Sequence, residues 1–167
     1  MITRRIPQGR FVIVADSGVA RILRASGNWP TPSGKMHGES RLEEIARLDS
    51  PAARQFKREL VSDRTGRVFD SRGRGGVGPP TRSRHGAASD YDPRKVETER
   101  FAKRLSRRLD IERRRLRMYE LVLIAAPRFL GVLRPELSGP TRELVSREVT
   151  RDLTHATDER ILRAAFR

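Results

Sequence analysis

The sequence predicts one α/β domain built on a mixed β-sheet, and three observations lead to this prediction. Two apolar, β-branched runs, Arg10–Asp16 and Ala20–Ala25, flank a Ser17-Gly18 turn signal and indicate an antiparallel hairpin. A long helical pattern begins at Pro93. The apolar run Tyr119–Ala126 follows that helix and is typical of a strand covered on both faces, which predicts a parallel crossover. At 167 residues, the chain is long enough for a single hydrophobic core.

Breaker residues divide the region between the hairpin and the long helix. Gly27–Gly38 is rich in turn formers and predicts a loop, and Leu42–Leu48, which ends at an Asp-Ser-Pro breaker, predicts a third strand. Ala52–Leu60 is a candidate for a short helix. The segment Val61–Pro93 is dominated by Gly, Arg, Ser and Pro, and it cannot bury enough apolar surface to adopt one conformation. We therefore expect a mobile Gly/Arg-rich loop over residues 61–93.

The long helix is predicted over Arg94–Arg117, with Asp92 as its N-cap and Pro93 at its first position. Its apolar residues recur at helical spacing on one face, and they are Phe101, Leu105, Leu109 and Leu116. Most of its arginines lie elsewhere on the helix surface. Such a helix would be about 36 Å long, so it predicts a long basic surface on one side of the domain.

The C-terminal part continues the α/β pattern. A short helix is predicted over Arg128–Arg134, closed by Pro135, and Leu144–Val149 alternates like a half-exposed strand. Thr157 or Asp158 would cap a final amphipathic helix. The resulting order of hairpin, third strand, long helix, strand, helix, strand and helix also matches a ribonuclease-H-like arrangement.

The charge of the chain predicts a polyanionic partner. The chain has 36 basic and 21 acidic residues, a net charge of +15, and all but four of the basic residues are Arg. A guanidinium group offers a planar fork that matches phosphate oxygens, which favours nucleic acid, although a GC-rich genome would also raise the Arg content. The absence of Cys excludes disulfides and thiol chemistry. No apolar run is long enough to span a membrane and no export signal is visible, so we expect a cytoplasmic protein.

Short motifs that cover almost the whole chain add a resemblance to this description. They are Val12–Asp16 with Ala20-Arg21, Ser62–Ser71, Arg84-His85, Glu99–Ala102, Leu123–Gly131 and Asp152–Thr154. In this order they resemble the bacterial host-attachment family. That family is similar to the central domain of archaeal and eukaryotic peptide-chain release factors, so the resemblance implies a ribonuclease-H-like fold and a ribosomal or tRNA setting.

The Gly/Arg-rich loop decides between catalysis and binding at this stage. Release factors carry a Gly-Gly-Gln tripeptide on the corresponding type of loop, but this chain has Gly75-Gly76-Val77 and lacks the glutamine. We therefore expect a non-catalytic protein, without a cofactor, that binds rRNA or tRNA on the ribosome. The expected contacts come from Arg64, Arg67, Arg72, Arg74, Arg82, Arg84 and His85, from the helix residues Arg100, Arg104, Arg107 and Arg108, and from the loop backbone at Gly73, Gly75 and Gly76.

Two alternatives from other functional classes remain at this point. A metal-dependent nuclease or peptidyl-tRNA hydrolase would need carboxylates near the central strands, for which Asp16, Asp63, Asp70 and Asp152 are available. The default role of Asp16 and Asp152, however, is that of turn residues. A host-cell attachment factor is the other alternative, and the lack of an export signal disfavours it.

Overall fold

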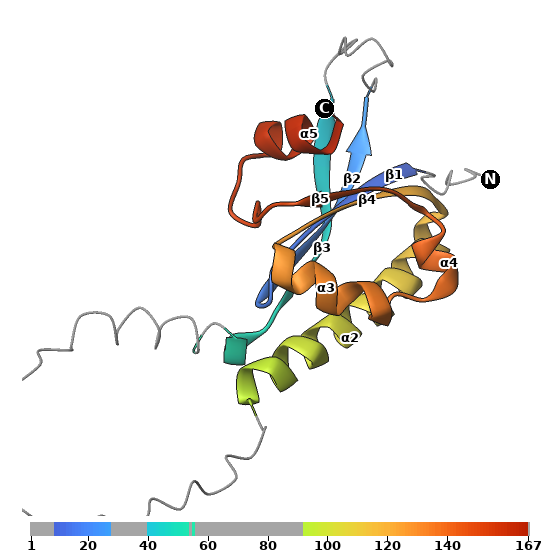
Figure 1. Ribbon diagram of the computed structural model, residues 1–167. Coiled ribbons are helices and arrows are strands. Elements are labelled where there is room, and N and C mark those ends of the chain that lie inside the picture. Colours follow the sequence, from blue (N-terminus) through green and yellow to red (C-terminus); the bar gives the residue numbers. More distant parts are fainter. Residues whose placement is uncertain (1–8, 28–39, 54, 56–91, 167) are drawn as a thin grey trace, which may run out of the picture.

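The computed structural model describes residues 9–27, 40–53, 55 and 92–166. In this part of the chain, five strands form one sheet in the order β3-β2-β1-β4-β5 (Figure 1). The strands are β1 (Gly9–Ala15), β2 (Val19–Ser26), β3 (Arg41–Asp49), β4 (Met118–Ala125) and β5 (Val145–Thr150). The main helices are α2 (Pro93–Leu116), α3 (Pro127–Glu136), α4 (Gly139–Arg142) and α5 (Asp158–Phe166).

The sheet is mixed, as the sequence predicts. β1 and β2 form an antiparallel hairpin, and β3 extends it as a second antiparallel neighbour of β2. β4 then pairs in parallel with β1 on its other side, and β5 pairs in parallel with β4. Because parallel strands need a crossover connection, α2 precedes β4, and α3 and α4 connect β4 to β5.

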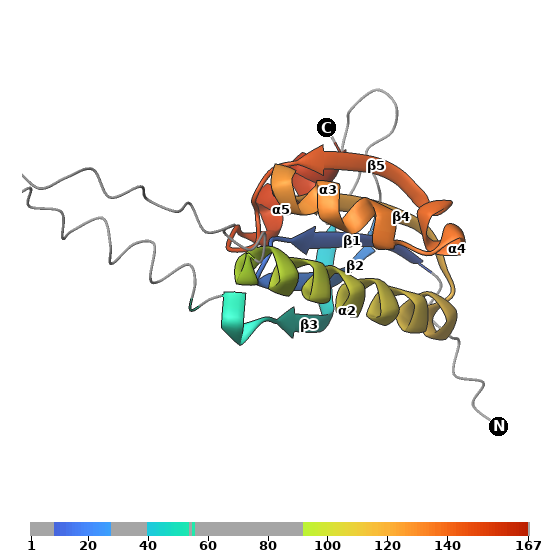
Figure 2. The ribbon, with the colours of Figure 1, turned by 60° about the horizontal axis from the view of Figure 1, so that its bottom comes forward.

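The larger core layer lies between the sheet and α2 with α3, which cover the same face (Figure 2). Phe101, Leu105 and Leu109 of α2 are fully buried there, in agreement with the predicted apolar face of this helix. Phe101 also packs on Phe129 of α3, with 5.7 Å between the ring centroids. These contacts fix α2 and α3 against the same face of the sheet.

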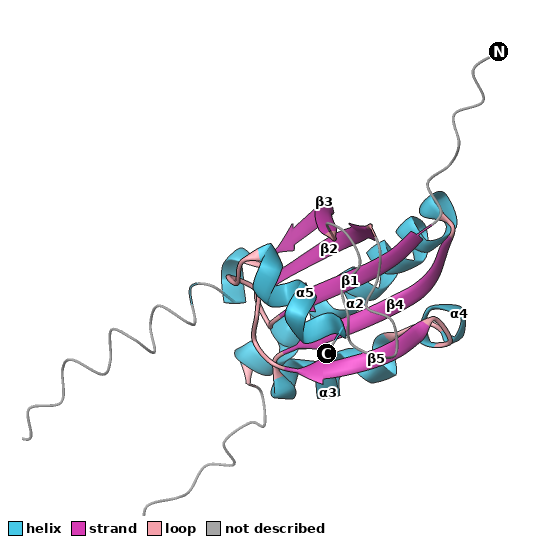
Figure 3. Cartoon of the chain, turned by 90° about the horizontal axis from the view of Figure 1, so that it is seen from above, coloured by secondary structure: helices cyan, strands magenta, loops and turns pink. Residues whose placement is uncertain are grey.

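The smaller core layer lies on the opposite face, which α5 covers (Figure 3). Ile161 and Ala165 of α5 pack there with Val12, Val14 and other inward-facing residues of the central strands. β1 is buried on both faces because it lies at the centre of the sheet. α5 has nine residues whereas α2 has 24, so the second layer is much less extensive than the first.

Most of the predicted elements agree with the structure to within two residues. Asp92 is the N-cap of α2, where its Oδ1 accepts a hydrogen bond of 2.9 Å from the backbone N–H of Arg94. One prediction is wrong in detail, because α3 does not close before Pro135 but runs to Glu136. A proline in the last turn removes only one helical hydrogen bond, and its φ is compatible with a helix.

Two other predictions fall largely outside the described residues. The structure assigns helix at residues 51–53 and 55, and the rest of the predicted helix over Ala52–Leu60 is not described. The same holds for the predicted loop, of which only residues 92 and 93 are described. Among the described residues, no helix combines the length and apolarity that crossing a bilayer requires.

Candidate anion-binding cleft

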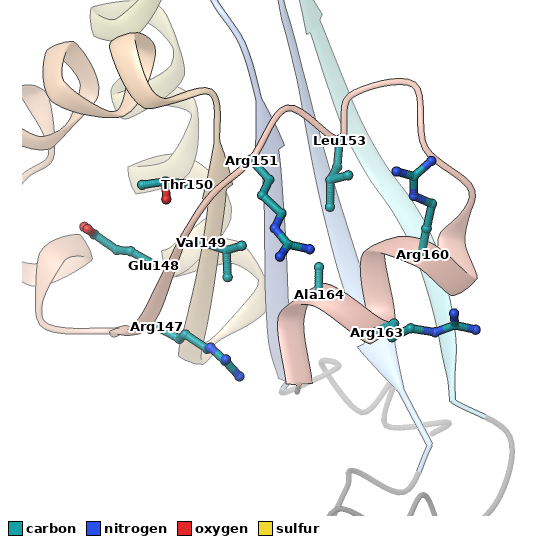
Figure 4. Close-up of a pocket in the computed structure, with 9 residues that line it drawn as sticks. All are labelled: Arg147, Glu148, Val149, Thr150, Arg151, Leu153, Arg160, Arg163 and Ala164. Atoms are coloured by element: carbon teal, nitrogen blue, oxygen red, sulfur yellow. The ribbon is translucent and has the colours of Figure 1, made fainter.

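A cleft of about 620 Å³ opens between β5 and α5 (Figure 4). Four arginines line it, together with Glu148, Thr150 and a small apolar group. The arginines come from two elements and the segment that joins them, and they are Arg147, Arg151, Arg160 and Arg163. The apolar group consists of Val149, Leu153 and Ala164, which pack against the smaller core layer. The cleft therefore combines positive charge with an apolar base.

A β-bulge in β5 determines which side chains face this cleft. Val145 pairs with Leu121 of β4, but the next register partner of β4 is Arg147, so Ser146 is the extra residue. Val145 consequently packs against the larger core layer, whereas Val149 packs against the smaller one. In a regular strand Val145 and Val149 would share a face. The bulge thus turns Arg147 and Val149 toward α5.

Arginines from two strands hold α5 in place. At the N-terminal end of the helix, Arg21 of β2 forms an ion pair of 3.2 Å with Asp158 and donates to the carbonyl oxygen of Ala156 at 3.4 Å. At the C-terminal end, Nη1 of Arg147 donates to the carbonyl oxygen of Ala165 at 3.4 Å. A cation near the last carbonyl groups of a helix also interacts favourably with the helix dipole. Arg147 therefore supports one wall of the cleft.

The acidic side chain in the cleft lining is engaged elsewhere. Glu148 accepts a hydrogen bond of 2.8 Å from Nε of Arg134 in α3, and it points away from α5 (Figure 4). This hydrogen bond, followed by the charge of Glu148, raises the pKa of Arg134 above its ordinary value. Glu148 is thus paired with a cation on the other side of β5, and it offers the cleft little compensation for its arginines.

The four cleft arginines differ in how they are engaged. Arg147 contacts α5 as described above, and Arg163 forms an ion pair of 2.6 Å with Glu159, whose side chain is 80% exposed. Within the described parts of the chain, the guanidinium groups of Arg151 and Arg160 have no hydrogen bond or ion pair, and both residues are exposed. These two groups are available to bind an anion.

The structure places the four predicted helix residues on the surface of α2, where Arg100, Arg104, Arg107 and Arg108 are all exposed. Two of them are already paired, since Arg104 contacts Glu97 at 3.3 Å and Arg108 contacts Glu112 at 2.8 Å. The guanidinium group of Arg104 also lies 5.4 Å from the centroid of the Phe101 ring. The charge of this helix is therefore partly compensated by its own neighbours.

Two carboxylates of α2 are tied to residues outside the helix. Glu97 accepts a hydrogen bond of 2.7 Å from the hydroxyl of Ser50. This bond is the main cause that lowers the pKa of Glu97, and Arg104 contributes. Asp110 accepts a hydrogen bond of 2.6 Å from the hydroxyl of Ser138 and one of 2.7 Å from the hydroxyl of Thr141. The Ser138 bond is again the largest cause of a lowered pKa, here that of Asp110. These acids connect α2 to neighbouring segments.

The predicted loop residues lie outside the described residues. They are Arg64, Arg67, Arg72, Arg74, Arg82, Arg84 and His85, with the backbone of Gly73, Gly75 and Gly76. Their expected contacts therefore stay predictions of the sequence.

The acidic residues considered for metal catalysis act as turn residues where the structure describes them. Oδ1 of Asp16 accepts hydrogen bonds of 2.7 Å from the N–H groups of both Gly18 and Val19. Oδ1 of Asp152 accepts from the backbone N–H and the hydroxyl of Thr154, at 3.3 Å and 2.8 Å. In the described parts of the chain, no group of three or more His, Asp or Glu side chains is arranged to hold a metal ion.

Comparison with known protein families shows to which family this chain belongs. Residues 11–164 match the family described as "Protein required for attachment to host cells". The chain belongs to this host-attachment family. A comparison with curated proteins finds no match.

The family assignment corrects the function predicted from the sequence. The prediction of an RNA-binding translation or stress factor on the ribosome is wrong, because the matching family is defined by attachment to host cells and not by translation. The wrong prediction rested on the excess of arginine and on the implied similarity to release factors. Part of that excess is instead used in ion pairs such as those of Arg104 and Arg108.

Sequence analysis also missed the residues that line the cleft. Arg160 and Arg163 are three positions apart on an amphipathic helix, and Arg147, Val149 and Arg151 follow the period of two that places strand residues on one face. Those spacings were visible in the sequence. That strand and helix would face each other across an open space depends on the bulge in β5 and on the anchoring of α5 by Arg21.

Proposed function

We propose that this protein acts in the attachment of its parent cell to a host cell, as a binding protein and not as an enzyme. The observation that carries the proposal is the family match, which extends over residues 11–164 and thus includes the whole sheet except the first two residues of β1. The sequence left an attachment role open as one of two alternatives.

The geometry of the cleft supports a binding role. Its lining offers arginine forks and a small apolar surface, and its acidic member pairs with Arg134. Cationic groups of this kind bind carboxylate, sulfate and phosphate groups. The two carboxylates most prominent in the sequence as candidate catalysts, Asp16 and Asp152, accept hydrogen bonds from their own turns.

The test is a deletion of the gene followed by a quantitative adhesion assay on cultured host cells. We expect the deletion strain to attach less well than the parent strain and a plasmid copy to restore attachment. Equal growth of the two strains in medium controls for a general defect. Unchanged attachment of the deletion strain would refute the proposed function.

The location of the protein is a separate question. The sequence predicts a cytoplasmic protein, and attachment can depend on a protein inside the cell or on its surface. Cell fractionation with an antibody against the protein distinguishes the two. A surface pool would show that the protein can contact the host directly, whereas a purely cytoplasmic pool would place its role upstream of the adhesive structure.

We also infer that the domain is ribonuclease-H-like and that its similarity to the central domain of release factors is a similarity of fold. The support is the strand order β3-β2-β1-β4-β5, with the first three strands antiparallel and the last two added in parallel. Superposition of an experimental structure on that release-factor domain tests the inference. A different strand order or direction in the superposed sheets would refute it.

A further inference from the structure

We propose that the cleft between β5 and α5 binds an extended acidic polysaccharide, with Arg151 and Arg160 contacting separate anionic groups along the polymer. The choice of a polysaccharide rests on the proposed attachment role, since carbohydrates cover cell surfaces. The presence of an anion site rests on the cleft alone.

Two of the four cleft arginines are free to bind a ligand. Arg147 donates to a carbonyl of α5, and Arg163 is paired with Glu159. The guanidinium groups of Arg151 and Arg160 have no partner among the residues that the structure describes. Because a guanidinium group binds a carboxylate or sulfate through two parallel hydrogen bonds, each of the two can hold one such group.

These two arginines come from different parts of the cleft lining. Arg151 directly follows β5, whereas Arg160 lies on α5, so they belong to opposite walls of the cleft. In Figure 4 they lie on either side of Leu153, and their guanidinium groups do not point toward one another. Two cationic groups on opposite walls match repeated charges better than a single one. A polymer that carries repeated charges can contact both.

The composition of the cleft lining indicates the class of polymer that it can bind. The lining residues of the cleft include no aromatic side chain among the residues that the structure describes. Binding of single-stranded nucleic acid usually depends on aromatic rings on which the bases stack. A charged sugar chain needs only forks for its acidic groups and a modest apolar surface, which Val149, Leu153 and Ala164 provide. The lining thus favours an acidic polysaccharide over RNA.

Isothermal titration calorimetry on the full chain tests the proposal with four probes of six monomer units each. They are a heparin hexasaccharide, a hexamer of galacturonic acid, the neutral sugar maltohexaose and a hexamer of uridylate. We expect at least one acidic sugar to bind, the neutral sugar not to bind, and the RNA to bind more weakly than the better sugar. Tighter binding of heparin favours a sulfated ligand such as those of host surfaces, and tighter binding of galacturonate favours a carboxylated polymer.

Two double variants locate the binding site. In Arg151→Gln/Arg160→Gln, each lost guanidinium should weaken binding of the acidic sugar by about tenfold or more. The matched control is Arg107→Gln/Arg128→Gln, which removes the same charge from exposed residues of α2 and α3, on the other face of the sheet. The control should change affinity by less than about threefold, an effect of net charge alone.

Three results would overturn the proposal. They are equal losses in the two double variants, tighter binding of uridylate than of both acidic sugars, and no binding of either acidic sugar. Circular dichroism of both variants checks that they fold, which we expect because the side chains of the four arginines form no hydrogen bond or ion pair with the described residues. The adhesion assay reports separately on the attachment role. Sugar binding by a protein whose deletion leaves attachment unchanged would refute that role and leave the anion site intact.

Discussion

Replacement of Asp16 by Ala should destabilise the protein by about 2–4 kcal/mol. Asp16 is only 3% exposed, and its Oδ1 accepts two hydrogen bonds of 2.7 Å, from the N–H groups of Gly18 and Val19. A hydrogen bond to a charged group contributes about 1.5–3 kcal/mol, and the turn can recover part of the loss by hydration. With a slope near 2 kcal/mol per molar urea, the midpoint of unfolding should fall by about 1–2 M. Urea titration followed by circular dichroism measures this shift.

Asp152→Ala is the matched control for this measurement. Asp152 makes the same kind of local turn with Thr154, but it is exposed, and its bond to the backbone N–H is 3.3 Å long. Its loss should cost less than about 1 kcal/mol because water can replace an exposed acceptor. Asp16→Asn retains an oxygen acceptor and should keep most of the stability. If the two alanine variants unfold at the same urea concentration, burial of the Asp16 turn does not contribute as we argue.

Three further outcomes follow from the described contacts. Glu112, whose side chain is 2% exposed, pairs with two arginines, so Glu112→Ala should lower the free energy of unfolding by about 1–3 kcal/mol. Arg115→Ala is the control, and it should cost less than about 1 kcal/mol because the Arg115 side chain is 57% exposed. Thermal unfolding measures both effects. The pKa of Asp110 in the folded protein lies below its ordinary value of 3.8, so its carboxylate stabilises the fold fully above pH 3.8. This stabilisation is lost as the pH falls through the folded-state pKa. Asp110→Asn should therefore flatten this part of a plot of stability against pH. Ser50→Ala removes the main cause of the lowered pKa of Glu97, so NMR titration should show that pKa moving up toward 4.5.

The fold was predictable where local sequence signals and tertiary packing agree. The hairpin of β1 and β2 follows from two β-branched runs around Ser17-Gly18, and the parallel placement of β4 follows from an apolar run after a long helix. The start of α2 was marked by Asp92 and Pro93, whose chemistry suits those two positions. In each case, neighbouring residues alone carry the information.

The candidate site was not predictable in the same way, because it depends on residues far apart in the chain. Arg21 is 137 positions from Asp158, yet their ion pair helps to hold the helix that forms one wall of the cleft. The bulge at Ser146 has no obvious sequence mark, and it determines that Val149 faces α5. Composition also misled the functional prediction, since a count of arginines does not tell which of them are paired.

The limited coverage of one face of the sheet explains how a charged cleft forms beside α5. α2 and α3 together bury the larger core layer, and two of the four predicted arginines of α2 pair with Glu97 and Glu112. On the opposite face, the nine residues of α5 leave a space next to β5, the strand at the edge of the sheet. Arginine stems can cover apolar surface there while their charged ends stay in water. An anionic ligand that enters this space can therefore contact the guanidinium groups of Arg151 and Arg160 and the apolar base at once.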